Sequence, residues 1–330
     1  MIISTFFNSY AGMYVAQSFC HSLIAAIITE RAVKAWKVDD PAAQQRFHLI
    51  AVIFPIFSFP LYQALNANRS SAQFRLDALF DINRWLNWEI WGAVPLGLLF
   101  LVMLIATSLV FLFQESIPVV KHTLESRNAE HDGTQCAPEP FVEKASRDLS
   151  LEAPEVLMLD DDEPVLFSTT GRDPVIFISA GLRNALTEDQ LHAALAHELA
   201  HIARSRRPLL ITVFVLRAIM FFNPAVLVKF RRAVRDEEKI CDDIAVSLTG
   251  NPKALAGALE KFYHKPAAPV ETDGRKLPAV PLPIEEYSHN LHLESRISRL
   301  EHGAARTRKN ETALFAITLL VITVLNYFVV

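Results

Sequence analysis

At 330 residues, the chain has room for one large domain or for two of ordinary size. Apolar residues make up 51% of it and charged residues 21%, which is rich in apolar residues for a soluble protein. The net charge of −4 gives no basis for nucleic-acid binding, and the three widely spaced cysteines indicate no disulfide framework. We therefore expect a membrane protein whose water-exposed parts lie in a reducing compartment.

Four apolar blocks are each about long enough to cross a hydrocarbon core of ~30 Å as a helix. Polar Gln17 and His21 interrupt the first block, and Pro55 and Pro60 lie in the second, so the third and fourth blocks are the cleanest. Three tryptophans around the start of the third block indicate an aromatic belt at the membrane interface. The blocks are 11–29, 48–66, 91–114 and 312–330, and the tryptophans are Trp85, Trp88 and Trp91.

Basic residues near the ends of these blocks predict the orientation of the chain. Lys and Arg are frequent in the loop after the first block and in the flanks of residues 115–311, and rarer between the second and third blocks. By the positive-inside rule, both termini lie outside and residues 115–311 lie in the cytoplasm. We expect a multi-pass protein of the inner cell membrane.

The cytoplasmic region begins with a polar segment and continues with short strands and a helix. Turn residues separate the strands, and Thr187 and Gln190 form a capping box that opens the helix. Apolar residues then recur at the spacing of a buried helical face. The expected linker is 119–150, and the expected strands are Glu155–Leu159, Pro164–Ser168 and Val175–Ser179.

That helix carries an H-E-x-x-H motif formed by His197, Glu198 and His201. Residues four apart share one helical face, so both imidazoles can reach a single metal ion. Glu198 lies close enough to handle a proton of a water on that ion. An ordinary amphipathic helix is the alternative interpretation. A catalytic zinc normally has three protein ligands, so two histidines are not sufficient.

Downstream, the apolar segment Pro208–Phe222 would span only ~22 Å as a helix, which is too short for a clean crossing. We expect a re-entrant or interfacial helix, or one packed into the bundle. Asn223-Pro224 predicts the start of the next helix, because asparagine caps helices and proline fits their first position. That helix is expected to stop near Gly250, and the proline-rich Pro266–Pro283 is expected to be a loop.

The helix after Asn223-Pro224 supplies the best candidate for a third metal ligand, Glu238. Asp242, four residues on, shares its face and is placed to accept the second ring N–H of one of the two histidines. Such a contact fixes the imidazole tautomer. Glu237 stays open as an alternative ligand, and Asp243 as an alternative to Asp242.

Several stretches together resemble the membrane-anchored gluzincin peptidases. Two related groups fit: the β-lactam-sensing antirepressor peptidases of the BlaR/MecR type, and the HtpX and CAAX prenyl protease group. The resemblance covers roughly residues 155–300, and Phe222–Pro224 with the Cys241-Asp242 pair favours the first group. The matching stretches are Ile178–Leu182, Leu186–Leu191, His197–His201 and Glu238-x-x-Cys241-Asp242.

The resemblance implies a zinc ion bound by His197, His201 and Glu238, with Glu198 as the general base. It also implies that a strand upstream of the helix pairs with an extended peptide substrate by β-augmentation. Pro164–Ser168 is the strand that we expect in this role.

The prenyl protease group has a histidine shortly before an arginine near the oxyanion. In this sequence, Arg296 is preceded by His289 and His292, and neither has the expected spacing. These three residues are candidates for contacts with the oxyanion or the substrate.

The expected fold class is α+β and mainly helical: a multi-pass transmembrane helix bundle with a cytoplasmic zincin-like metallopeptidase domain that contains a small sheet. The expected parts are three transmembrane helices with loops in 1–118, a linker in 119–150, the zinc metallopeptidase domain in 151–310 with the membrane-apposed segment 208–222, and a C-terminal transmembrane helix in 311–330.

The expected function is zinc-dependent endopeptidase activity on a membrane-associated or cytoplasmic protein, in regulatory or quality-control proteolysis. The expected partners are a protein or peptide substrate at the membrane face, the lipid bilayer and a membrane partner that supplies a signal, with no nucleic acid. The alternative is a catalytically silent membrane signalling scaffold with a structural zinc site. A transporter with a zinc site is a third interpretation. It would need polar residues spread through the membrane helices, and only His21 and Gln17 are of that kind.

Overall fold

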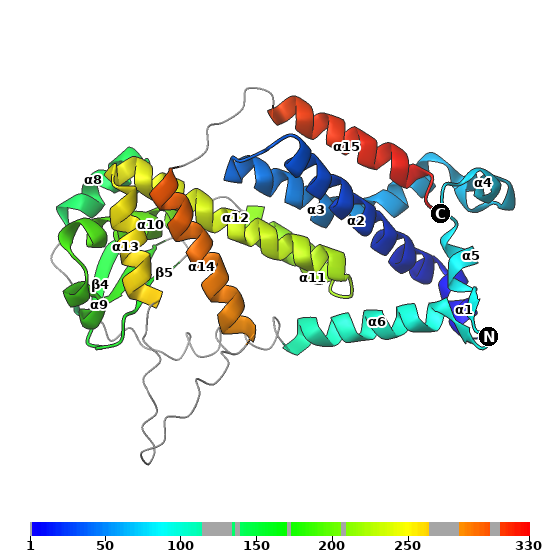
Figure 1. The fold of residues 1–330 in the computed structure, drawn as a ribbon, viewed down its shortest axis with the longest axis horizontal. Coiled ribbons are helices and arrows are strands. Elements are labelled where there is room, and N and C mark those ends of the chain that lie inside the picture. The colour runs from blue at the N-terminus through cyan, green and yellow to red at the C-terminus, as the bar shows by residue number, and fades with distance from the viewer. Residues whose placement is uncertain are drawn as a thin grey trace, which may run out of the picture. The chain divides into compact units, whose positions relative to one another are not determined.

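The computed structural model describes residues 2–113, 134–135, 139–169, 173–205, 209–263, 284–303 and 311–330. The chain divides into two compact units. Helix α12 (Pro224–Thr249) runs from the first unit into the second (Figure 1). The first unit comprises Met1–Ala129, Leu209–Glu237 and Arg306–Val330, and the second comprises Glu130–Pro208 and Glu238–Ala305.

Helices dominate the first unit, and polar caps mark where the two longest begin. The Ser9 hydroxyl accepts from Gly12 N at 3.1 Å before α2, and the Asp40 carboxylate accepts from Ala43 N at 2.8 Å before α3. The helices and strands are α1 (Ile2–Asn8), α2 (Tyr10–Ala35), α3 (Pro41–Leu65), the 3-10 helix η1 (Ala67–Ser70), α4 (Ala72–Asp77), α5 (Ile82–Leu86), β1 (Glu89–Ile90), β2 (Val94–Pro95), α6 (Leu96–Phe111), α11 (Leu209–Ile219) and α15 (Glu311–Tyr327).

Two of the described helices, α2 and α3, are long and apolar enough to cross a membrane by length and composition. The apolar helices α6 and α15 are shorter, with 16 and 17 residues, or about 24 and 25 Å at 1.5 Å per residue. The third and fourth apolar blocks, which contain the fewest interrupting residues, thus form the shorter helices α6 and α15. The four-span bundle stays a prediction.

Local structure explains why α6 is shorter than its apolar block. Strands β1 and β2 pair antiparallel, and Trp91 and Gly92 turn the hairpin with positive φ values of 54° and 65°. The helix begins only after Pro95, whose extended conformation ends the hairpin. Trp91 is therefore 94% exposed at the tip of a hairpin instead of lying in the first turn of a helix.

At the other end of the chain, α15 ends at Tyr327, and an arginine side chain caps its last carbonyl groups. The buried Arg69 guanidinium donates to the carbonyl oxygens of Asn326 and Tyr327 at 3.1 and 2.9 Å. Positive charge at a helix C-terminus is favourable. The following residues pair with Phe80, whose carbonyl accepts from Val330 N at 2.9 Å.

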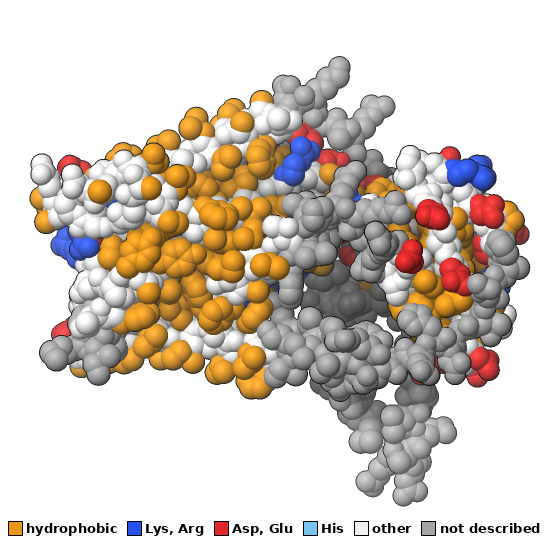
Figure 2. Space-filling view, turned by 180° about the vertical axis from the view of Figure 1, so that it is seen from behind, with side chains coloured by type: hydrophobic (Ala, Val, Ile, Leu, Met, Phe, Trp, Pro, Cys, Tyr) orange, Lys and Arg blue, Asp and Glu red, His pale blue; other side chains and the backbone are white. Residues whose placement is uncertain are grey.

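Small buried residues along α2 permit close packing in the first unit. Gly12, Ala16, Ser22, Ala25 and Thr29 are all buried, and short side chains let helix backbones approach closely. Large apolar side chains of the same unit remain exposed, and Figure 2 shows hydrophobic side chains over much of the face in view. Exposed examples are Leu23, Ile27, Phe57, Leu61, Val102, Ile105, Leu320 and Val324.

The second unit holds a four-stranded sheet of order β3-β4-β6-β5 with helices around it. Strands β4 and β6 are parallel, and β5 pairs antiparallel with β6, so β5 is an edge strand in the described sheet. The elements are β3 (Thr134–Gln135), α8 (Pro140–Asp148), β4 (Glu155–Leu159), β5 (Leu166–Ser168), β6 (Val175–Ser179), α9 (Ala180–Ala185), α10 (Glu188–Ser205), α13 (Pro252–Tyr263) and α14 (Ile284–His302), with the C-terminal part of α12.

Helix α10 lies at the centre of this unit, packed on two sides. Leu195 and Leu199 join the core formed with Ile176 of β6, while Ala193 and Ala196 pack in a second cluster with residues of α13 and α14. The capping box is present: Thr187 N donates to Gln190 Oε1 at 3.1 Å, and Gln190 N donates to Thr187 Oγ1 at 3.4 Å. The core helix of the unit is therefore the helix that carries the H-E-x-x-H motif.

Most predicted elements of the second unit are confirmed, with two differences. Strands β4 and β6 have the predicted bounds, β5 begins two residues later than predicted, and α12 has the predicted Asn223 cap and ends before Gly250. Helix α8 lies within the range expected as a linker, because Pro140 starts a helix whose Val142 and Ala145 are buried in the core. The predicted loop Pro266–Pro283 lies outside the described residues.

Candidate metal centre

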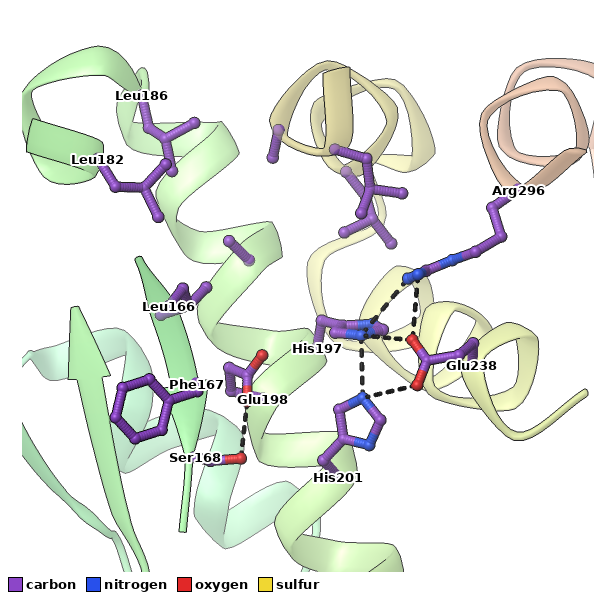
Figure 3. Close-up of a pocket in the computed structure, with 14 residues that line it drawn as sticks. Leu166, Phe167, Ser168, Leu182, Leu186, His197, Glu198, His201, Glu238 and Arg296 are labelled. Atoms are coloured by element: carbon purple, nitrogen blue, oxygen red, sulfur yellow. Dashed lines mark hydrogen bonds and ion pairs between the residues drawn. The ribbon is translucent and has the colours of Figure 1, made fainter. Parts of the chain in front are cut away.

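Helix α10 presents the three residues of the motif on the side that its core leucines leave open. His197 and His201 are four residues apart, and their Nε2 atoms lie 3.1 Å from each other. His197 is buried and His201 is partly exposed. The motif therefore places two ring nitrogens together at the side of a helix that the core holds in place (Figure 3).

Helix α12 brings Glu238 to the same point. Its Oε2 lies 3.6 Å from His197 Nε2, and its Oε1 lies 3.6 Å from His201 Nε2. One ligand atom from each of the three residues lies within 4.8 Å of the others. Within the described part of the chain, this group of histidine and carboxylate side chains could hold a metal ion.

Two further residues surround this group. Asp242 Oδ1 lies 3.1 Å from Nδ1 of His197, although the angle misses that of a good hydrogen bond. Arg296 of α14 donates two hydrogen bonds to Asp242, from Nε to Oδ2 at 2.8 Å and from Nη2 to Oδ1 at 2.7 Å. Its Nη1 lies 3.0 Å from Glu238 Oε2. A single arginine thus orients both carboxylates of α12.

The electrostatics of the group favour a bound positive charge. Burial alone would lower the pKa of His197, but the adjacent Asp242 and Glu238 carboxylates outweigh it and raise that pKa to about 9. Burial would raise the pKa of Glu238, but the hydrogen bond with His197 and the charges of His201 and Arg296 lower it to about 2. The pKa of Asp242 is also lowered against burial, chiefly by Arg296. Both carboxylates thus stay ionised and attract a cation.

Glu198 points away from this group, toward the edge strand. The Ser168 hydroxyl of β5 donates to Glu198 Oε2 at 2.7 Å (Figure 3). Sequence reasoning predicted a strand ending at Ser168, but not this contact, which depends on how α10 crosses the sheet. The signal in the sequence was a hydroxyl residue at the end of the expected substrate-binding strand.

A cavity of about 370 Å³ opens beside these side chains. Its polar part is formed by Ser168, His197, Glu198, His201, Glu238 and Arg296, and apolar residues line the remainder. The apolar lining is supplied by β5, α9, α10 and α13, through Leu166, Phe167, Leu182, Leu186, Ala194, Leu255, Ala258 and Leu259. A polar reaction centre therefore adjoins a pocket that suits an apolar side chain.

Two acids that the sequence left open as alternatives, Glu237 to Glu238 and Asp243 to Asp242, make other contacts. The Glu237 carboxylate accepts a hydrogen bond from Gln45 at 2.7 Å, and the Asp243 carboxylate accepts one from Arg299 at 2.6 Å. Cys241, which the sequence assigned to packing, is buried with its Sγ 3.5 Å from His201 Nδ1. His289 and His292 belong to α14, but their side chains are outside the described part of the structure.

Comparison with known sequences assigns this arrangement to a family. The sequence profile of the BlaR1 peptidase M56 family matches residues 49–254, which include the motif, Glu238 and Asp242. The chain belongs to the BlaR1 peptidase M56 family.

The chain is also similar to curated relatives named protease HtpX homologues. The relative from Desulforapulum autotrophicum is 28% identical over 212 residues, which cover 50% of this chain and 68% of the relative. Those from Salinibacter ruber and Acidiphilium cryptum are 27% and 30% identical over 207 and 173 residues, covering 51% and 42% of this chain and 74% and 60% of the relatives. Both findings support a membrane metallopeptidase of the BlaR and HtpX group.

Proposed function

We propose that this chain is a multi-pass, inner-membrane zinc endopeptidase that cleaves membrane-associated or cytoplasmic proteins, with its active site on the cytoplasmic side. The observation that carries the proposal is the convergence of His197, His201 and Glu238 beside Glu198, at the mouth of a cavity. Membership of a peptidase family supports it. Regulatory or quality-control proteolysis is the role that we assign.

The spacing of the three ligand side chains is compatible with zinc. In a tetrahedral site with bonds of 2.0–2.1 Å, neighbouring ligand atoms lie about 3.3 Å apart. The two Nε2 atoms lie 3.1 Å apart, and each lies 3.6 Å from a different oxygen of Glu238, Oε2 for His197 and Oε1 for His201. Three protein ligands are typical of a catalytic zinc, whereas a structural zinc normally has four. The catalytically silent scaffold is therefore not favoured.

In the proposed reaction, Glu198 is the general base and acid. A bound zinc would polarise the scissile carbonyl and make water more acidic. Because Ser168 binds Glu198 Oε2, we assign Oε1 as the atom that takes a proton from water and gives it to the leaving amine. Arg296 and Asp242 hold His197 and Glu238 in place. Direct contact of Arg296 with the oxyanion stays a prediction.

Edge strand β5 is the proposed docking site for the substrate backbone. An extended peptide can add to the open edge of a sheet through main-chain hydrogen bonds, with side-chain pockets giving specificity. Strand β5 ends at Ser168, which contacts Glu198, so a peptide paired with it would pass the base. The apolar part of the cavity would then accept an apolar side chain next to the scissile bond.

The decisive experiment uses the purified full chain in lipid nanodiscs and a library of fluorogenic peptides. We expect cleavage that is lost after removal of zinc by a chelator and regained when zinc is restored. Absence of zinc-dependent cleavage, with zinc bound at one ion per chain, would support the silent scaffold instead. N-terminal mapping of the membrane proteome with and without the active chain would then identify the substrates.

Leu186→Trp tests the proposed pocket. The larger side chain narrows the cavity, so we expect kcat/KM to fall about tenfold for peptides with leucine or phenylalanine beside the scissile bond. Peptides with alanine there should change by less than twofold. Leu149→Trp is the matched control, because Leu149 packs against the same core without lining the cavity. Equal losses for both peptide classes would contradict the pocket.

Ser168→Ala tests how the base is held. Hydrogen bonds to charged groups are worth about 1.5–3 kcal/mol, so losing this one should lower kcat/KM about tenfold or more. Zinc affinity should not change, because Ser168 is not among the proposed ligands. Ser168→Thr keeps the hydroxyl and should retain most of the activity. A Ser168→Ala variant as active as the wild type would remove Ser168 from the mechanism.

A further inference from the structure

The two histidines of the motif have different partners at their second ring nitrogens. The Nε2 atoms face each other and Glu238, and Figure 3 shows the remaining nitrogen of His201 turned away from this group. Nδ1 of His197 lies 3.1 Å from Asp242 Oδ1. Nδ1 of His201 lies 3.5 Å from the sulfur of Cys241. A carboxylate thus adjoins one ring, and a cysteine sulfur adjoins the other.

Both partners come from α12, one turn beyond Glu238, within the second unit. A helix advances about 100° per residue, so Cys241 projects about 60° to one side of the direction of Glu238, and Asp242 about 40° to the other. Both side chains are buried, with exposed fractions of 0% and 1%. Glu238 therefore faces the Nε2 atoms, and two residues of the next turn each meet one Nδ1 atom.

The contact at Nδ1 decides how an imidazole presents its other nitrogen. A neutral imidazole that binds a metal through Nε2 carries its proton on Nδ1, and the group that accepts this proton fixes the tautomer and the orientation of the ring. Carboxylates, backbone carbonyls and water are the usual acceptors, and a cysteine sulfur accepts more weakly. The sulfur beside His201 therefore acts in the same way as a carboxylate, with a smaller effect.

Cys241 is placed to act through His201 and not as a ligand itself. Its sulfur lies at Nδ1, whereas the proposed ligand atom of His201 is Nε2. Among the described residues, the group whose ligand atoms lie within 4.8 Å of one another consists of His197, His201 and Glu238, without Cys241. The sulfur therefore contacts a ligand and not the proposed metal position.

We propose that Cys241 is a positioning residue for the metal ligand His201. Its sulfur accepts the Nδ1 proton of His201 and so holds Nε2 toward the proposed zinc position, as Asp242 does for His197. All the contacts involved join α10 and α12 within the second unit. The inference rests on the proposed function, because it presupposes that His201 binds zinc.

Three substitutions of Cys241 separate its hydrogen bond from its packing. Cys241→Ala makes the side chain smaller and Cys241→Val makes it slightly larger, and both remove the acceptor, whereas Cys241→Ser keeps one. Zinc affinity is measured on the full chain in nanodiscs by competition with a chromogenic chelator. It should fall about tenfold for Cys241→Ala and Cys241→Val, because loss of such a partner costs about 10–100-fold. Cys241→Ser should bind zinc at least threefold more tightly than Cys241→Ala.

The visible spectrum of the cobalt-substituted protein gives a second readout that is independent of cleavage. Cys241→Ala should alter the d–d bands, because a less constrained His201 changes the ligand geometry, while Cys241→Ser should resemble the wild type. A sulfur-to-cobalt charge-transfer band that is present in the wild type and lost in Cys241→Ser would make Cys241 a ligand, and would overturn the inference.

Cys20→Ala is the matched control. It makes the same substitution at a partly buried cysteine of α2, in the first unit. Its zinc affinity should stay within twofold of that of the wild type. If all three Cys241 variants bind zinc like Cys20→Ala, with the wild-type cobalt spectrum, the inference is wrong.

The inference is equally wrong if zinc affinity follows side-chain size, with Cys241→Val near the wild type and Cys241→Ser as weak as Cys241→Ala. The comparison of Cys241→Ser with Cys241→Val decides the question even if the cavity left by Cys241→Ala prevents folding. A wild-type chain that binds no zinc would instead refute the proposed function.

Discussion

Glu198→Gln is expected to abolish proteolysis while the chain keeps its zinc. The amide has the shape of the carboxylate and can still accept the Ser168 hydrogen bond, but it cannot take a proton from water. General acid–base catalysis contributes about 10²–10⁴-fold, so cleavage of the fluorogenic peptides should fall by about 10³-fold. Zinc content measured by mass spectrometry of the purified protein should stay at the wild-type value.

Glu188→Gln is the control for this change, because it makes the same substitution in the exposed first turn of the same helix. It should leave both cleavage and zinc content unchanged. If Glu198→Gln cleaves peptides at the wild-type rate, Glu198 is not the base and the proposed mechanism fails.

Glu238→Ala is expected to weaken zinc binding strongly. The change removes one of three ligands and leaves Arg296 without one of its two carboxylate partners on α12. Because loss of a supporting residue around a metal site already costs 10–100-fold in affinity, we expect at least a 100-fold loss for a ligand itself. Competition with a chromogenic chelator measures this loss, and Glu238→Asp, one methylene shorter, should be intermediate.

An exposed acid supplies the comparison for that substitution. Glu260 lies on the surface of α13, and Glu260→Ala should bind zinc like the wild type. Unchanged zinc affinity in Glu238→Ala would mean that the third ligand lies elsewhere, and Glu237→Ala would be the next variant to measure.

Local signals predicted the second unit well. The capping box at Thr187, the cap at Asn223 and the glycine after α12 fixed three helix ends, because these signals act through atoms only a few residues away. The strands β4 and β6 followed from short apolar runs between turn residues. Helix α8 was not predicted, since its polar sequence shows its buried face only where the core covers Val142 and Ala145.

The first unit shows where hydropathy is a poor guide to helix length. The block that starts at Trp91 is mostly apolar, yet its first residues belong to a hairpin, in which Val94 and Pro95 pair with Ile90 and Glu89. At the end of the last block, Arg69, more than 250 residues away in the chain, binds the final carbonyl groups of α15. Neither the hairpin nor this contact is visible in a window of local sequence.

By itself, the sequence determined the residues on which the proposed chemistry rests: two histidines one helical turn apart with a glutamate between them, a later acidic helix, and the motifs that resemble a peptidase family, which the match to the BlaR1 peptidase M56 family supports. The sequence named Glu238 as the best third ligand and left Glu237 open, and only the tertiary structure shows Glu238 beside both histidines while the Glu237 carboxylate accepts a hydrogen bond from Gln45. The reason is physical: spacing fixes which side chains share a face of one helix, but how that face meets another helix of the same unit is set by packing and by contacts with distant residues such as Arg296.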